Sequence, residues 1–345
     1  MALPASGQIT MNQVNVELGN SGTAQIGMND ADVRGLFGIA SGEIEMADGY
    51  GQSNVAWYGS RALSAGGYGG ARINTIDYLT IANTGNATDF GDLYAAVTGP
   101  AGCSDGSRGL FAGGRGPATS TWTSDIAYVD CDTAGNTTDF GDLTQARASG
   151  GAVSDGSRGV FFAGQRASTY GTLTNVIDYV TIANTGNATD FGDATVARVF
   201  PAGMSNGSRG VFAGGESVYN IDYITIATAG NAIDFGDLTV TDAPAGFSGG
   251  DRGVFGGEYG NIASIRYVDI TTTSNASFFG NLSAARGYMS AASNDSRGVF
   301  MGGLGVSVSR TNIADYVTIS TTGNATDFGD MTVGANSRGG LGGGS

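Results

Sequence analysis

The chain has 345 residues, 61 of them glycine, and its formal net charge of −15 argues against nucleic-acid binding, which needs a basic surface. It contains no histidine and no lysine, so all 16 basic residues are arginine. These absences exclude a Ser-His-Asp triad, a lysine Schiff base and a histidine-ligated zinc site.

Residues 1–54 contain short phrases of their own, which predict a small mixed module. An Ile-x-Met alternation occurs three times and favours short extended pieces. Two brief helical turns are also predicted, one capped by Asn12 and one by Asn29 or Asp30. Each turn is too short to be stable alone, so the module must pack on itself, on the rest of the chain or on a partner. The candidate contacts are the apolar residues of the turns: Val14, Val16, Leu18, Val33, Leu36 and Phe37.

Four runs of this segment occur in a definite order: 3–9 (LPASGQI), 14–19 (VNVELG), 28–34 (MNDADVR) and 41–51 (SGEIEMADGYG). In these runs the segment resembles the N-terminal module of many tailed-phage virion proteins, notably in phages of cyanobacteria and other aquatic bacteria. That resemblance implies docking to other virion proteins on the tail or capsid, where the chain is expected to form a homo-oligomer. The alternative is a small cap over one end of the domain that follows.

From about residue 55 onward, one unit is repeated six times. Each copy has an Arg-Gly phrase, which is Arg61-Ala62 in the first copy, followed by apolar residues. A Tyr-bearing phrase comes next, and then Asp-Phe-Gly-Asp or a close variant. The last Phe recurs at steps of 44 to 51 residues, at Phe90, Phe140, Phe191, Phe235, Phe279 and Phe328. Repetition at this period indicates an array of equivalent supersecondary units.

One copy, residues 145–193, predicts four short strands at 148–153, 158–164, 176–182 and from 188. Four antiparallel strands in this length are typical of a propeller blade. The phrase order also resembles the kelch repeat, in which a strand ends in Gly-Gly and an aromatic strand follows a variable loop. Phe stands here where that family usually has Trp. The predicted fold class is therefore all-β, a six-bladed kelch-like β-propeller over residues 55–338.

The strand order and the closure of the ring can also be predicted. The Gly/Ala/Ser-rich strand of each unit should be innermost, because small residues let neighbouring backbones approach near the axis. Residues 331–338 are expected to complete the first blade. Residues 339–345, which end in Gly-Gly-Gly-Ser, are predicted to be a flexible tail.

Three motifs match functional signatures, but they recur from unit to unit, which favours structural roles. Asp-Phe-Gly matches the magnesium-binding phrase of protein kinases, whose full signature also needs a lysine. Asp190 and Asp193 belong to an Asp-x-x-Asp phrase that could ligate Ca²⁺, but we favour hydrogen bonds to turn amides. Asn187-Ala188-Thr189 matches a glycosylation acceptor and is interpreted as a turn. No metal ion or cofactor is predicted.

Seven arginines recur near one place in the unit: Arg61, Arg108, Arg158, Arg209, Arg252, Arg297 and Arg338. A ring of arginines could bind an anion. We favour a structural role, in which each arginine pairs with an Asp of the neighbouring blade, because the guanidinium fork matches a carboxylate.

The two cysteines, the hydrophobic runs and the N-terminus indicate where the protein is made and located. Cys103 and Cys131 cannot form a disulfide framework, and we favour simple buried thiols. No run approaches the ~20 apolar residues of a membrane span, so no membrane insertion is expected. The N-terminus lacks the basic-then-apolar pattern of a signal peptide. We expect synthesis in a host cytoplasm and localisation to the virion surface by assembly.

The loop after the Gly pair differs most among the repeats, and such loops emerge on one face of a propeller. Exposed aromatic and arginine side chains there suit sugar stacking and partner contacts. The candidate ligand-binding residues are Tyr68, Arg72, Arg115, Trp122, Arg166, Tyr170, Tyr219, Tyr259 and Arg310. The alternative is that these loops vary freely because they have no function.

Three functions remain to be compared. The first is a non-enzymatic virion protein whose propeller binds a host surface glycan or receptor. The second is a purely structural virion component, such as a capsid decoration or a collar or baseplate spacer. The third is a glycan hydrolase, which needs two opposed acids at the channel mouth. The repeated Asp residues look like turn residues and only five glutamates are present, so no enzymatic activity is predicted.

Overall fold

The computed structural model describes residues 59–343 except 117–120, 167–171, 239–243 and 258–261. The chain divides into two compact units, Met1–Ala56 and Trp57–Ser345. The predicted N-terminal module and its six docking residues lie outside the described residues. Within the described part the elements are strands, apart from the short 3-10 helix η2 (Val306–Val308).

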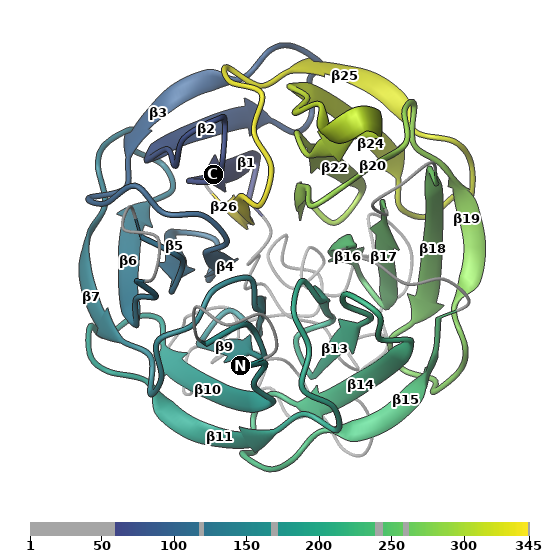
Figure 1. Cartoon of the computed structure of the whole chain (residues 1–345). Coiled ribbons are helices and arrows are strands. Elements are labelled where there is room, and N and C mark those ends of the chain that lie inside the picture. The colour runs from purple at the N-terminus through teal and green to yellow at the C-terminus, as the bar shows by residue number, and fades with distance from the viewer. Residues whose placement is uncertain (1–58, 117–120, 167–171, 239–243, 258–261, 344–345) are drawn as a thin grey trace, which may run out of the picture. The chain divides into compact units, whose positions relative to one another are not determined.

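Six four-stranded antiparallel sheets are arranged in a ring, which confirms the predicted six-bladed β-propeller (Figure 1). From the axis outward, blade 1 contains β26 (Gly339–Gly343), β1 (Arg61–Ala65), β2 (Thr75–Thr80) and β3 (Thr88–Asp92). Blade 2 contains β4 (Ala101–Ser104), β5 (Arg108–Ala112), β6 (Asp125–Asp130) and β7 (Thr138–Asp142). Blade 3 contains β8 (Gly151–Ser154), β9 (Arg158–Phe162), β10 (Val176–Thr181) and β11 (Thr189–Asp193).

The other three blades repeat this order. Blade 4 contains β12 (Ala202–Ser205), β13 (Arg209–Ala213), β14 (Asn220–Thr225) and β15 (Ile233–Asp237). Blade 5 contains β16 (Ala245–Gly249), β17 (Arg252–Gly256), β18 (Ser264–Asp269) and β19 (Ser277–Asn281). Blade 6 contains β21 (Ser290–Ser293), β22 (Arg297–Met301), β24 (Ile313–Thr318) and β25 (Thr326–Asp330). Beside blade 6, β20 (Arg286–Gly287) pairs with β23 (Leu304–Gly305).

The innermost strands are the small-residue strands, as the sequence predicts. Each contacts the innermost strands of both neighbouring blades around the axis. Serines near their ends link them, because Ser248 donates to the Ser205 carbonyl at 2.6 Å and Ser293 to the Ser248 carbonyl at 2.6 Å. The third residue of each strand instead points between blades and is buried there, as at Met204 and Phe247. Along each innermost strand, small residues at the axis therefore alternate with larger side chains that lie between blades.

The predicted flexible tail is wrong for residues 339–343, which form the closing strand β26. The C-terminal chain does complete blade 1, but through these glycines, which pair with β1, and not through residues 331–338. A Cβ at Gly340 would lie 2.6 Å from the Ala291 carbonyl oxygen, and one at Gly342 would lie 2.6 Å from that of Ser293. Glycine is needed here for close approach at the axis, a requirement that composition alone does not distinguish from a flexible linker.

The Asp-Phe-Gly phrase lies in the outermost strand of a blade. Its Phe is buried and meets the blade's Tyr edge-on, with ring centroids 5.9 Å apart for Tyr179 and Phe191. A bulge in the pairing of β10 with β11 precedes Asp178. Gly192 has φ +143°, and a Cβ there would lie 2.6 Å from the Gly230 carbonyl of the next blade. The glycine therefore allows the outer strand to lie directly against its neighbour.

An asparagine of the next blade completes this contact. Asn231 Oδ1 accepts a hydrogen bond from the Asp193 amide at 3.0 Å. Equivalent bonds join every pair of neighbouring blades through Asn86, Asn136, Asn187, Asn231, Asn275 and Asn324. The Asn-Ala-Thr motif thus follows the predicted turn, with Asn187 and Ala188 in the connection and Thr189 at the start of β11, and its asparagine joins two blades.

Replacing Gly192 by Ala is expected to lower the free energy of unfolding by about 2 kcal/mol, because the new Cβ meets backbone and φ is positive. Gly230→Ala, on the other side of the same contact, is the matched control, because a Cβ there meets nothing within 4 Å. Chemical denaturation of both variants measures the difference. Equal stability of the two variants would contradict this account of the contact.

Candidate functional site

The arginines of the Arg-Gly phrase join neighbouring blades, as the favoured structural role predicts. Their predicted pairing with an Asp of the neighbouring blade is wrong. Arg108 Nη1 donates to the Ile182 and Ala183 carbonyls of blade 3, each at 2.9 Å. Its guanidinium also stacks on Tyr128 of its own blade, 4.8 Å from the ring centroid. Arg61, Arg158, Arg209, Arg252 and Arg297 make the same two kinds of contact. Where the guanidinium meets the neighbouring blade, its partners are backbone carbonyl oxygens and not the expected carboxylate.

A second set of arginines forms buried ion pairs that the sequence-based prediction missed. The pairs are Arg147–Asp178, Arg198–Asp222, Arg286–Asp315 and Arg338–Asp77, with N–O distances of 2.6 to 2.8 Å. Arg338 therefore belongs to this set, which leaves six arginines at the position that the sequence analysis identified. Each arginine lies in the connection that enters a blade, and each aspartate lies in that blade's third strand. Three of these arginines, Arg147, Arg198 and Arg286, share a sequence signal, because each lies five residues after the Phe-Gly-Asp or Phe-Gly-Asn phrase. Arg338 lies eight residues after its phrase and does not share this spacing.

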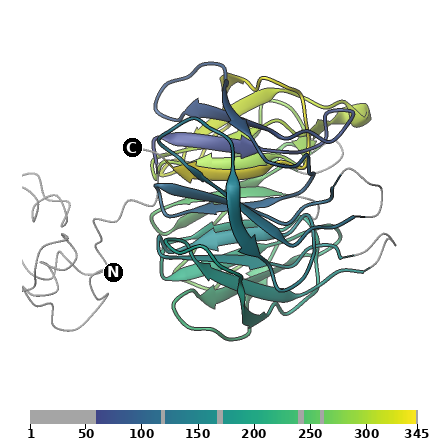
Figure 2. The ribbon, with the colours of Figure 1, turned by 90° about the vertical axis from the view of Figure 1, so that its left-hand side faces the viewer.

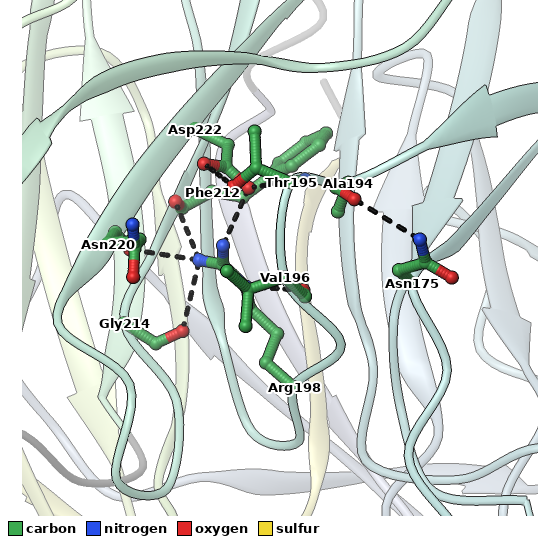
Figure 3. Close-up of polar contacts among 9 residues, drawn as sticks. All are labelled: Asn175, Ala194, Thr195, Val196, Arg198, Phe212, Gly214, Asn220 and Asp222. Carbon is green, nitrogen blue, oxygen red and sulfur yellow. Dashed lines mark hydrogen bonds and ion pairs between the residues drawn. The ribbon is translucent and has the colours of Figure 1, made fainter.

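The Arg198 pair shows what these arginines do (Figure 3). Arg198 Nη2 lies 2.6 Å from Asp222 Oδ2, and Nη1 donates to the Gly214 carbonyl at 3.3 Å and the Asn220 carbonyl at 2.9 Å. Thr195 donates its hydroxyl to Asp222 Oδ1 at 2.6 Å. Burial lowers the pKa of Arg198, and the Asp222 carboxylate partly offsets this. Because Gly214 and Asn220 are the two ends of the blade 4 variable loop, the buried arginine fixes the base of that loop.

Blades 2 and 5 depart from this arrangement. In blade 2, Val97 and Ala127 occupy the two positions, and they line a small pocket of about 20 Å³, room for about one water molecule. In blade 5, Arg266 replaces the aspartate, and the residue at the arginine's place, Asp242, lies outside the described residues. Both positions changed together in each case, which indicates that the pair acts as a unit.

Replacing Asp222 by Ala is expected to lower the free energy of unfolding by about 3–5 kcal/mol, because Arg198 would keep its buried charge without a partner. The double variant Arg198→Val, Asp222→Ala copies the residues of blade 2 and should recover most of that loss. Denaturation of the single and double variants gives both values. A double variant no more stable than the single one would show that the charge imbalance is not the cause.

The variable loops and the connections between blades lie at the same end of the sheets, here called the loop face. Figure 2 shows the sheets from the side, with the described parts of the variable loops on the right. Arg166 is exposed in blade 3 and Tyr219 is 51% exposed in blade 4. Tyr170 and Tyr259 lie outside the described residues. The other five predicted residues come from blades 6, 1 and 2.

These five residues, Tyr68, Arg72, Arg115, Trp122 and Arg310, are here called the basic arc. Arg310 lies over the Tyr68 ring at 4.5 Å from its centroid, and Arg115 lies over the Trp122 ring at 5.0 Å. Backbone bridges join Tyr68 to Arg72 and Arg115 to Trp122. Burial and the positive charge of Arg115 lower the pKa of Arg72, while Tyr68 acts in the opposite direction. The arc thus contains one stacked pair that joins blade 6 to blade 1 and a second stacked pair in blade 2.

Two exposed valines beside the basic arc were not predicted. Val306 is 52% exposed and Val308 is 59% exposed, at the tip of the blade 6 loop. Ser307 and Val308 both have positive φ, at 61° and 55°. That conformation is strained for a β-branched residue, and such strain is concentrated at functional sites. No sequence pattern marked these residues, because the strain is a property of the folded backbone.

The central channel is lined by backbone and by small residues of the inner strands, such as Gly102, Ala152, Gly203 and Gly246. No carboxylate is among the described residues that line it. The lining therefore does not supply the two opposed acids that glycan hydrolysis requires. Among the described residues, no group of three or more acidic or cysteine side chains is placed to hold a metal ion.

Cys103 and Cys131 are buried free thiols, as favoured from the sequence. Burial raises the pKa of both, that of Cys131 to about 12. In the part of the chain that the structure covers, no helix is long and apolar enough to cross a membrane.

The chain is thus a six-bladed β-propeller whose internal framework repeats from blade to blade and whose loops differ on one face. No protein-family model matches it, and no curated protein matches it in sequence.

Proposed function

We propose that this chain is a non-enzymatic phage virion protein that docks through residues 1–54 and presents the loop face to a host surface glycan or receptor. The observation that carries the proposal is the contrast between the two ends of the blades. At one end, repeated turns are fixed by the same asparagine and arginine contacts in every blade. At the loop face, the six loops differ and carry aromatic and arginine side chains. Variable loops on a rigid scaffold are a frequent site of binding.

The point where the chain enters the propeller supports this arrangement. Ser60 accepts a hydrogen bond from the Ile81 amide, in the turn between β2 and β3. That turn lies at the end of the sheets opposite the variable loops. At Ser60, the described chain therefore enters blade 1 at the end opposite its variable loop. Resemblance of residues 1–54 to phage docking modules supports the attachment to other virion proteins.

A purely structural virion role is the second candidate, and one observation favours it. Ile233 is 57% exposed and Phe278 is 58% exposed on the outermost strands of blades 4 and 5. Other blades have Thr or Ser at the first of these positions and Asp at the second. Exposed apolar side chains on an outer strand suit packing against neighbouring subunits in a particle. A capsid decoration or a collar or baseplate spacer would use this surface.

Binding of the full-length chain, labelled with a fluorophore, to cyanobacterial and other aquatic bacterial cells tests the first candidate. We expect binding that is lost after periodate oxidation of the cell-surface sugars. The Ile233→Thr, Phe278→Asp variant is the control, because it restores the residues of the other blades and should bind cells like the unchanged chain. Antibody labelling of intact particles locates the protein. Labelled particles without any cell binding would favour the structural role.

A further inference from the structure

Charge is unevenly distributed over the loop face. The variable loops of blades 6, 1, 2 and 3 contain Arg310, Arg72, Arg115 and Arg166 and no acidic residue. All three acidic residues of the loops and interblade connections, Glu216, Asp242 and Glu258, belong to blades 4 and 5. In a chain of net charge −15, one sector of one face therefore carries four cations without an acidic loop residue.

Within this sector the basic arc holds two of its cations in defined orientations. Arg310 and Arg115 are each stacked on an aromatic ring, at 4.5 Å and 5.0 Å. A guanidinium that is stacked on an aromatic ring is already oriented, so it loses fewer rotamers when it binds a ligand. Asp125, three residues after Trp122, is hydrogen-bonded to Tyr94, and burial together with this carboxylate raises the pKa of Tyr94.

Two further observations indicate that the arc is arranged for an anion. Burial and, after it, repulsion by the positive charge of Arg115 lower the pKa of Arg72. An anion between them would relieve that repulsion. The strained tip at Ser307 and Val308 comes just before Arg310 in the chain and presents exposed valine side chains. Methyl groups beside cations and aromatic rings suit a ligand with both carbon–hydrogen faces and negative groups.

We propose that the basic arc binds an anionic saccharide, with Arg72, Arg115 and Arg310 contacting its carboxylate or sulfate groups and Tyr68 and Trp122 contacting its ring faces. This proposal rests on the proposed glycan-binding function and specifies its ligand class and its site. Guanidinium groups form bidentate hydrogen bonds with carboxylates and sulfate-like oxyanions. A sugar ring has apolar faces that pack on aromatic rings. A nucleic acid is disfavoured because the rest of the molecule is strongly acidic.

The test uses the full-length chain and four polymers: polygalacturonate, the same polymer with its carboxylates reduced to alcohols, dextran sulfate and dextran. Biolayer interferometry should show binding to one or both of the charged polymers and none to the neutral counterparts. Which charged polymer binds distinguishes carboxylate from sulfate as the recognised group. Binding should weaken as the ionic strength rises, because exposed charges are screened.

Variants assign the binding to the arc. Arg310→Gln and Arg115→Gln should each weaken binding about tenfold, as expected for loss of one charge-assisted contact. Arg310→Lys keeps the charge and should retain part of the affinity. Arg166→Gln removes one exposed cation from blade 3 of the same face and should change affinity less than twofold, by comparison with the arc variants. Thermal melts confirm that each variant is folded.

Several results would overturn the proposal: equal binding of neutral and charged polymers, an equal loss for Arg166→Gln and Arg310→Gln, or arc-dependent binding of a single-stranded oligodeoxynucleotide at the same strength. The same variants separate this proposal from the broader one. If the unchanged chain binds cells and the arc variants bind them equally well, the arc is not the site and the host-binding function stands. If arc-dependent polymer binding occurs without any cell binding, the host-binding function is wrong and the saccharide site stands.

Discussion

Contact between neighbouring blades is the interaction on which the rest of this structure depends. A single four-stranded blade cannot bury its two faces, so repeat units of this kind are stable only when stacked. The buried clusters therefore span blades: Leu63 and Leu341 of blade 1 pack with Phe111 and Val129 of blade 2. Polar contacts follow the same boundary, from the serines near the axis to the asparagines at the rim. Most features that repeat six times in the sequence serve this boundary, and few serve a ligand.

The buried Arg–Asp pairs connect this framework to the loop face. Their charges are costly to bury, and replacing such a pair by apolar residues is often neutral for stability. Their retention in four blades therefore suggests a contribution to geometry. Arg338 donates to the Ser64 and Thr75 carbonyls, near the two ends of the blade 1 loop, as Arg198 does in blade 4. The loops can then differ in sequence while their bases stay fixed, which is the arrangement that a binding face on a rigid scaffold requires.

The uneven charge of the loop face distinguishes one sector of it from the rest. A ring of six similar units could present the same chemistry six times, yet the arginines gather over blades 6, 1 and 2 while the acidic loop residues are in blades 4 and 5. The strained backbone at Val308 lies in the same sector. Such asymmetry on a repetitive framework suits a single ligand site better than a six-fold symmetric contact. On the outer surface, Ile233 and Phe278 mark a second departure from the repeat, suited to a neighbouring subunit.

The sequence by itself determined the number of blades, their four-strand pattern and the identity of the innermost strand, because these depend on periodicity and residue size. It also identified the loops that carry the candidate site, because they are where the repeats differ. Only the tertiary structure decided which partners the repeated residues have. Arg108 meets carbonyl oxygens and not a carboxylate, Arg338 belongs to the buried pairs, and the glycines of β26 form a strand. Arg310 meets Tyr68 because ring closure places blade 6 beside blade 1. No local pattern contains this proximity between residues far apart in the chain.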